Sequence, residues 1–202
     1  SLLVGAATVI FAGLLGCTLG AVACYFGNVA DDIVSKISEI FLAFPFLLIA
    51  IAIMAFLGQG VVNLIMALML SRWVQYCRVV RGEVLSIKER DFVTAVKALG
   101  GRDGYVLLRH VVPNTIASIT VIATFAMAIV IISEASLSFL GLGVPAHIPT
   151  WGSMLSEGRS YINRAPWLTI FPGLAIFITV FGINLLGDGL RDIFDPKLRR
   201  QR

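Results

Sequence analysis

The chain has 202 residues, of which 58% are hydrophobic and only 14% are charged. Soluble domains carry about 25% charged residues, so this composition excludes an ordinary water-soluble domain and predicts an integral membrane protein. The net charge of +4 does not indicate nucleic-acid binding, because the positive-inside rule for membrane proteins explains it.

Long windows without charged residues predict about five membrane-spanning helices, because a helix needs roughly 20 apolar residues to cross the ~30 Å hydrocarbon core. In chain order these spans are residues 2–26, 33–56, 61–80, 114–137 and 166–187. The first window is not a removable signal peptide, since no basic leader precedes it. The expected fold class is therefore all-α, a polytopic transmembrane helix bundle in a single domain.

The first two spans carry special residues. Gly16 and Gly20 have the small-xxx-small spacing that lets helix backbones approach closely in lipid, although an ordinary glycine-rich membrane helix shows the same pattern. Pro45 lies inside the second span and should kink or unwind it. The turn at residues 58–60 separates the second span from the third.

The charged segment between the third and fourth spans predicts a short amphipathic helix at about residues 90–100. Its apolar face comprises Phe92, Ala95, Val96 and Leu99. The polar residues around it are Arg90, Asp91, Thr94 and Lys97. Gly100 and Gly101 should end this helix.

A second short stretch, residues 104–112, follows this helix and is expected to end at Pro113. The amphipathic helix itself has three possible roles. It could lie on the membrane surface, form part of a structured loop, or place its apolar face in a groove on a partner protein.

The outer part of the predicted bundle contains an ionisable residue, Glu134, beside Ser133 near the end of the fourth span. Such a residue could face a translocation path, or it could be a helix-end carboxylate that is hydrogen-bonded to a neighbouring helix. The loop at residues 139–164 should contain a short helix against the outer face. Its Trp151 could belong to an outer gate or could only pack.

The basic residues set the orientation. Of the 16 Lys and Arg residues, all except Arg159 and Arg164 lie in the connection between the first two spans, in residues 72–109, or in the tail at residues 188–202. The positive-inside rule places these three segments in the cytoplasm and the N-terminus outside.

Other kinds of site are not expected. Cys17, Cys24 and Cys77 lie in or beside apolar stretches without metal-ligand spacing, so neither a metal site nor a disulfide is predicted. The sequence has no GxxxxGK[ST] phosphate loop, so the chain should bind no nucleotide or other cofactor. We find no nucleophile with a base at membrane depth, which argues against a membrane enzyme.

Several motifs together resemble one family, the permease subunits of dipeptide/oligopeptide/nickel-type ABC importers. Thr94-Ala95-Val96, Gly100 and Pro113 resemble the cytoplasmic EAA loop of these importers, with Thr94 in place of the acidic residue. The other matching segments are residues 109–114, 135–143, 149–155, 184–192 and 195–197. The family usually has one more span upstream, which we expect this sequence to lack.

The resemblance implies a type I ABC importer permease fold in which the helix at about 90–100 is a cytoplasmic coupling helix. The implied ATPase-coupling residues are Arg90, Asp91, Phe92, Thr94, Ala95, Val96, Lys97, Leu99, Gly100, Gly101 and Pro113. The candidates for the translocation path or outer gate are Glu134, Ser133 and Trp151. ATP and Mg²⁺ would bind to partner subunits and not to this chain.

The resemblance also implies partners and a location. The partners would be a second permease subunit, two cytoplasmic ATPase subunits and an extracytoplasmic solute-binding protein, in the lipid bilayer of a prokaryotic inner membrane and without nucleic acid. The solute would be a peptide or a similar small molecule. The alternative is a self-contained channel or secondary carrier, which usually shows repeated halves with broken helices in matching positions.

Overall fold

The structure is a computed structural model that describes residues 1–145 and 147–194, and every regular element within these ranges is helical. The helices are α1 (Leu2–Phe26), α2 (Asn28–Leu42), α3 (Phe46–Leu57), α4 (Val61–Lys88), α5 (Asp91–Ala98), α6 (Asp103–Val106), α7 (Val112–Phe139), α8 (Trp151–Gly158) and α9 (Trp167–Phe194). A π-helical turn spans Leu107–Val111 and a 3₁₀ turn spans Arg159–Tyr161. The predicted motif at 195–197 and the rest of the tail lie outside the described residues.

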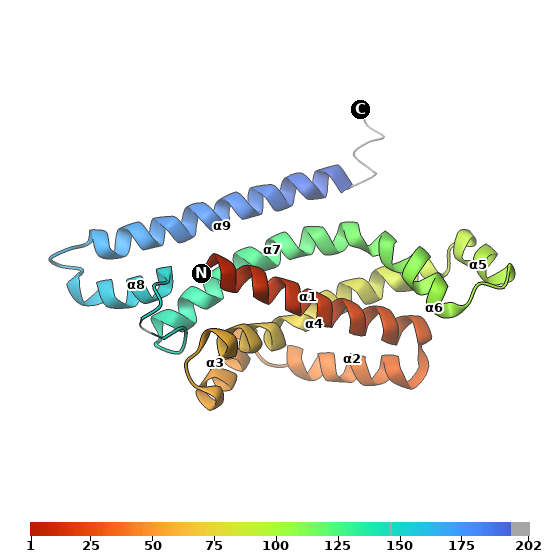
Figure 1. Ribbon diagram of the computed structural model, residues 1–202, viewed down its shortest axis with the longest axis horizontal. Helices are drawn as coiled ribbons and strands as arrows, with labels where there is room; N and C mark the ends of the chain where they lie inside the picture. The colour runs from red at the N-terminus through yellow and green to blue at the C-terminus, as the bar shows by residue number, and fades with distance from the viewer. Residues whose placement is uncertain (146, 195–202) are drawn as a thin grey trace.

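The long helices run along one axis of the molecule. In Figure 1, α1, α4, α7 and α9 extend along the horizontal axis, with α8 at one end and α5 and α6 at the other. The predicted all-α bundle is therefore confirmed.

The closest helix pair is α1 with α4, and glycines make it possible. A Cβ atom at Gly16 would collide with the carbonyl oxygen of Trp73, and one at Gly20 would lie 2.5 Å from the carbonyl oxygen of Cys77. Backbones can approach this closely only where side chains are absent. The small-xxx-small pattern of the first span thus marks a specific contact face.

The second predicted span is two helices. α2 ends at Leu42 and α3 begins at Phe46, and their axes differ by 89°. Pro45 occupies the N-cap position of α3 with φ −57° and ψ 127°, because its ring cannot continue the preceding helix. The predicted break at Pro45 is confirmed, and its size makes the pair either a broken span or a re-entrant loop.

Fewer helices than predicted satisfy the length and hydropathy of a membrane span. Within the described residues, three stretches do so, namely Leu2–Phe26, Asp103–Phe139 and Trp167–Phe194, and the bent α2–α3 pair would be a fourth. The predicted third span is not among them, because polar residues such as Arg72 and Gln75 interrupt the apolar run of α4. This α4 continues to Lys88, well beyond the predicted end at residue 80.

The predicted stop at Pro113 is wrong. Residues 103–139 form one continuous helical stretch, in which a π-helical turn precedes the proline. Val112 donates its backbone N–H to the carbonyl of Leu107, five residues back. The wider π turn accommodates Pro113, which lacks an N–H and would clash with the carbonyl of a regular α-helix.

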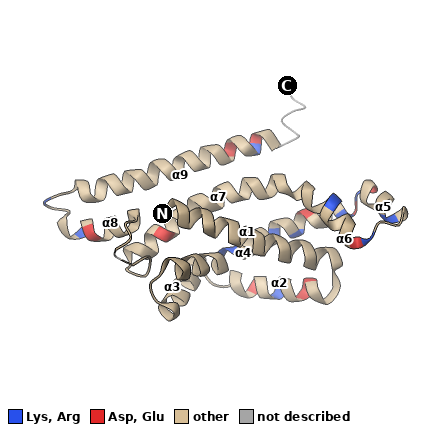
Figure 2. Cartoon of the chain, in the orientation of Figure 1, with Lys and Arg blue, Asp and Glu red and all other residues tan. Residues whose placement is uncertain are grey.

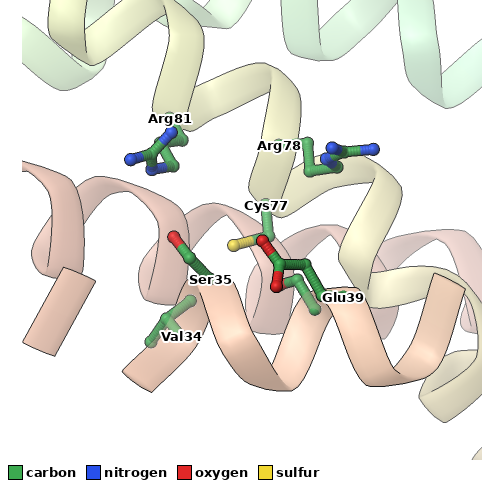
Figure 3. Close-up of a pocket in the computed structure, with 7 residues that line it drawn as sticks. Val34, Ser35, Glu39, Cys77, Arg78 and Arg81 are labelled. Atoms are coloured by element: carbon green, nitrogen blue, oxygen red, sulfur yellow. The ribbon is translucent and has the colours of Figure 1, made fainter. Parts of the chain in front are cut away.

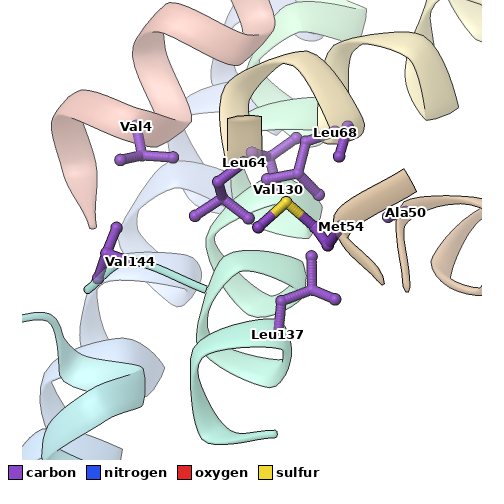
Figure 4. Packing of buried hydrophobic residues seen from close by; sticks show 9 residues of the cluster. Val4, Ala50, Met54, Leu64, Leu68, Val130, Leu137 and Val144 are labelled. Carbon is purple, nitrogen blue, oxygen red and sulfur yellow. The ribbon is translucent and has the colours of Figure 1, made fainter. Parts of the chain in front are cut away.

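Two apolar clusters hold the ends of the bundle. The cluster at the α8 end joins α1, α3, α4 and α7, and Figure 4 shows its members Val4, Ala50, Met54, Leu64, Leu68, Val130, Leu137 and Val144. The cluster at the α5 end contains Ala21, Cys24, Val80, Val84, Ile87, Val93, Val106, Leu107 and Val111. The short helix α5 is therefore tied to this end of the long helices through Val93.

Candidate functional site

The predicted site residues separate into two groups at opposite ends of the molecule. The coupling residues lie on or next to α5, and Trp151 begins α8 at the other end of α7. Figure 2 shows charged residues gathered around α5, α6 and the adjoining part of α4. At 1.5 Å per residue, α7 separates the two ends by about 42 Å.

The short helix α5 is fixed to the bundle by one buried side chain. Val93 is 0% exposed and packs in the apolar cluster with Val106 and Val111. Burial of a Val side chain contributes about 1.5–3 kcal/mol. This anchor sets which face of α5 points outward.

The outward face of α5 is an apolar ridge. It consists of Phe92, Ala95 and Leu99, and Leu99 is 89% exposed while Phe92 is 39% exposed. Exposed apolar side chains next to each other are typical of interaction surfaces. Val96, which the sequence placed on this face, instead packs against the buried cluster.

The end of α5 is a Schellman motif. The N–H of Gly100 bonds the carbonyl of Lys97 at 2.9 Å, and the N–H of Gly101 bonds the carbonyl of Val96 at 3.0 Å. Gly100 has φ +88°, a left-handed conformation that favours glycine. The predicted helix end at Gly100 and Gly101 is confirmed.

A polar triad connects α5 to the end of α1. The hydroxyl of Tyr25 donates to Oδ1 of Asp103 at 3.0 Å, and Nζ of Lys97 lies 3.2 Å from the same oxygen. The ammonium also lies 4.9 Å from the centroid of the Tyr25 ring. The phenol oxygen of Tyr25 and the carboxylate of Asp103 raise the pKa of Lys97, so Lys97 stays charged.

The remaining coupling residues are exposed or lie apart. Arg90, Asp91 and Thr94 are exposed around the start of α5. Pro113 is exposed in the first turn of α7, where it shapes the π turn and is not part of α5.

At the α8 end of the molecule, Ser133 and Glu134 of α7 lie next to Ala135, which the start of α8 contacts. Glu134 is 0% exposed, and its Oε1 accepts a hydrogen bond of 2.8 Å from the hydroxyl of Ser138. Its Oε2 is buried without a hydrogen-bond partner among the described residues. Ser133 is also buried, and its hydroxyl donates to the carbonyl of Ile129 at 2.7 Å.

The short helix α8 packs closely on α7. The side chain of Thr150 accepts from the N–H of Ser153 at 3.2 Å, and the hydroxyl of Ser153 accepts from the N–H of Thr150 at 3.0 Å, which forms a capping box. A Cβ atom on Gly152 would lie 2.5 Å from the carbonyl oxygen of Ala135. The predicted short helix in the loop is confirmed, and it places Trp151 one residue from this contact.

A polar pocket of about 120 Å³ lies between α2 and α4. Figure 3 shows Ser35 and Glu39 of α2 facing Cys77, Arg78 and Arg81 of α4. Beside the pocket, Arg81 binds Asp31 with two hydrogen bonds of 2.8 and 2.7 Å. This bidentate pair connects α2 and α4 at the ends that lie near α5.

Four residues that shape these regions were not predicted from the sequence. Val93 was missed because apolar residues occur on both faces of α5, and Tyr25 and Asp103 were missed because their contact joins distant segments. Arg72 was counted with the cytoplasmic charges, whereas the structure places it inside α4 and buries it. An arginine at the twelfth residue of a predicted span is itself an indication of a functional position.

No group of three or more His, Cys, Asp or Glu residues within 1–145 and 147–194 is arranged to hold a metal ion. One end presents a fixed apolar ridge, and the other holds a buried carboxyl group beside a capped short helix.

Comparison with known proteins gives a family and a set of relatives. The model of the family "binding-protein-dependent transport system inner membrane component" matches residues 12–200. The dipeptide transport system permease protein DppC of Alkalihalophilus pseudofirmus is 44% identical over 98% of this chain. The glutathione transport system permease protein GsiD of Pectobacterium atrosepticum is 42% identical over 98%, and the oligopeptide transport system permease protein OppC of Bacillus subtilis is 40% identical over 99%.

The chain spans 66% of the length of each of these relatives. Among solved structures, a chain of the MetNI methionine ABC transporter in an inward-facing conformation aligns with a TM-score of 0.76 at 19% identity. The alignment covers 96% of this chain and 93% of that chain. The two chains thus share a fold, and the predicted importer permease architecture is confirmed.

Proposed function

This chain belongs to the family of binding-protein-dependent transport system inner membrane components, and from this premise we propose that it forms one half of the translocation path of an ATP-driven importer. It is a multi-pass protein of a prokaryotic inner membrane. The solute is a peptide or a peptide-like molecule, a proposal supported by the dipeptide, oligopeptide and glutathione relatives.

The observation that carries this proposal is the apolar ridge of α5. Phe92, Ala95 and Leu99 are exposed on a helix whose other face is held by Val93. An amphipathic helix of this kind fits a hydrophobic groove on a partner. We assign the ridge to a groove on a cytoplasmic ATPase subunit that binds ATP and Mg²⁺.

The proposed assembly has two permease subunits, two ATPase subunits and an extracytoplasmic binding protein. ATP-driven closure of the ATPase pair moves the α5 helices, and the bundles switch between inward-open and outward-open states. The α5 end and the tail then face the cytoplasm, and the N-terminus and α8 lie outside. Glu134, Ser133 and Trp151 contribute to the path or to its outer gate, where Glu134→Gln should reduce uptake.

The test uses the complete importer in proteoliposomes. ATP-dependent uptake should require the ATPase subunits and the binding protein together. Uptake by the permease alone would instead support the alternative of a self-contained channel or carrier.

The docking role of the ridge is tested by Phe92→Asp. Because a charge in an apolar groove costs desolvation without a paired hydrogen bond, this variant should reduce recovery of the ATPase subunits in co-purification at least tenfold. Tyr161→Asp is the matched control, since it adds the same charge at an exposed aromatic residue on the other end. Equal recovery of ATPase with Phe92→Asp and with the control would refute docking through the ridge.

A further inference from the structure

Helix α4 carries a basic residue about halfway along its length. Arg72 lies about 17 Å from the start of α4 at 1.5 Å per residue. For a helix that enters the ~30 Å hydrocarbon core at its first residue, this position is close to the middle of the core. Ionisable residues at this depth are rare and usually mark a path for solutes or ions.

Within the described residues, Arg72 has no ionic partner. The residue is 8% exposed, and its Nε and Nη2 atoms are buried without a hydrogen-bond partner. Among the described residues, its one charge-specific contact is with the ring of Phe46, whose centroid lies 3.6 Å from the guanidinium carbon. By contrast, Arg81 on the same helix donates from Nε and Nη2 to the two carboxylate oxygens of Asp31.

This arrangement leaves a positive charge uncompensated. A cation–π contact offsets only part of the cost of removing a guanidinium group from water. A planar guanidinium group is suited to bind a carboxylate with two parallel hydrogen bonds. An anionic group is therefore the partner that best satisfies the buried nitrogens.

A second positive element lies at the same place. Phe46 is the first residue of α3, a helix of 12 residues that starts at the break after Pro45. The first N–H groups of a helix have no partner within it, and the helix dipole makes this end attractive to anions. Broken membrane helices with such ends bind anionic solute groups in several transporter folds.

The break lies where Arg72 is covered. Leu42, the last residue of α2, and Phe44, in the turn before α3, are exposed. The Phe46 ring lies over the guanidinium group, so a displacement of α3 relative to α4 would uncover Arg72.

We propose that Arg72 and the amino-terminal end of α3 form a carboxylate-binding site that holds the solute during its passage through the membrane. The proposal rests on the proposed importer function. Dipeptides, oligopeptides and glutathione, the solutes named for the relatives, all carry a terminal carboxylate.

The experiment measures ATP-dependent uptake by the complete importer in proteoliposomes, with dialanine, trialanine and glutathione as probes. Parent protein is compared with Arg72→Gln, Arg72→Lys and the control Arg191→Gln, whose parent residue is exposed in the last turn of α9. We expect Arg72→Gln to reduce uptake about tenfold, Arg72→Lys to retain most of it, and Arg191→Gln to match the parent. The same binding protein serves every variant, so its own solute preference cancels in the ratios.

Two outcomes overturn the site. Parent-like uptake by Arg72→Gln would show that no solute contact depends on this charge. A lowered melting temperature, or loss of the second permease subunit from the purified Arg72→Gln complex, would assign Arg72 to a structural pair with a partner chain. Absence of ATP-dependent uptake of any of these probes by the parent would instead contradict the proposed function.

Discussion

Gly16 and Arg72 show how single residues define this bundle. At Gly16 the absence of a side chain lets the backbone of α4 approach α1, since an added Cβ would lie 2.7 Å from the Cβ of Tyr76 and closer still to the carbonyl oxygen of Trp73. At Arg72 a long side chain places a charge where the bundle has no counter-charge among the described residues. One residue thus serves packing, and the other is a candidate for function.

Gly16→Val should destabilise the bundle, because the contacted atoms are backbone atoms of Trp73 and Cys77 and the Cβ of Tyr76, none of which can move aside without moving α4. Overpacking of this kind costs about 1–3 kcal/mol. The measurement is thermal unfolding of the purified chain in detergent. Gly82→Ala is the control, since no atom lies within 4 Å of an added Cβ there. If Gly16→Val and Gly82→Ala have the same melting temperature, the tight α1–α4 contact does not form in detergent.

At the scale of elements, α5 depends on its ending as much as on its faces. The chain turns through Gly100 in a left-handed conformation and then enters α6, so the Schellman motif sets the angle between these two helices. A residue with a Cβ atom in this conformation costs roughly 1–2 kcal/mol.

Gly100→Leu should therefore displace the apolar ridge and reduce solute uptake per ATP hydrolysed by the complete importer. Gly104→Ala is the matched control, because this glycine has no unusual φ and an added Cβ meets nothing. The readout is the ratio of uptake to ATP hydrolysis in proteoliposomes. An unchanged ratio for Gly100→Leu would mean that coupling tolerates a different course of the chain after α5.

The sequence predicted those elements whose signals are local. Pro45 and the Gly100–Gly101 pair act on the residues next to them, so the break and the helix end could be expected from their chemistry. The π turn before Pro113 could not be expected in this way. It depends both on the proline and on the tertiary packing of Leu107 and Val111 in the cluster around Val93.

The site was only partly predictable for a similar reason. The periodicity of residues 92–99 indicated an amphipathic helix, but both Val93 and Leu99 are apolar, and only the tertiary structure decides which one is buried. The Tyr25–Asp103 bond spans 78 residues of sequence and leaves no periodic trace.

At the scale of the whole molecule, the two functional ends should face opposite sides of the membrane. Cys17, Cys24 and Cys77 are first replaced by Ala. A single cysteine is then introduced at Leu99 or at Ser160, which are both exposed. A membrane-impermeant maleimide should label Ser160→Cys in right-side-out vesicles and Leu99→Cys in inside-out vesicles. Labelling of both positions from one side would exclude the proposed orientation.

The helix of residues 103–139 continues through the π turn before Pro113, and this has a mechanical consequence. At 1.5 Å per residue it is about 55 Å long, so a tilt of about 5° about one end displaces the other by about 5 Å. A displacement at α6 would therefore reach Glu134 along the backbone of one helix, in which the π turn is the place that can bend. Inserting a flexible glycine pair at the π turn would interrupt this transmission while leaving the residues of each site in place.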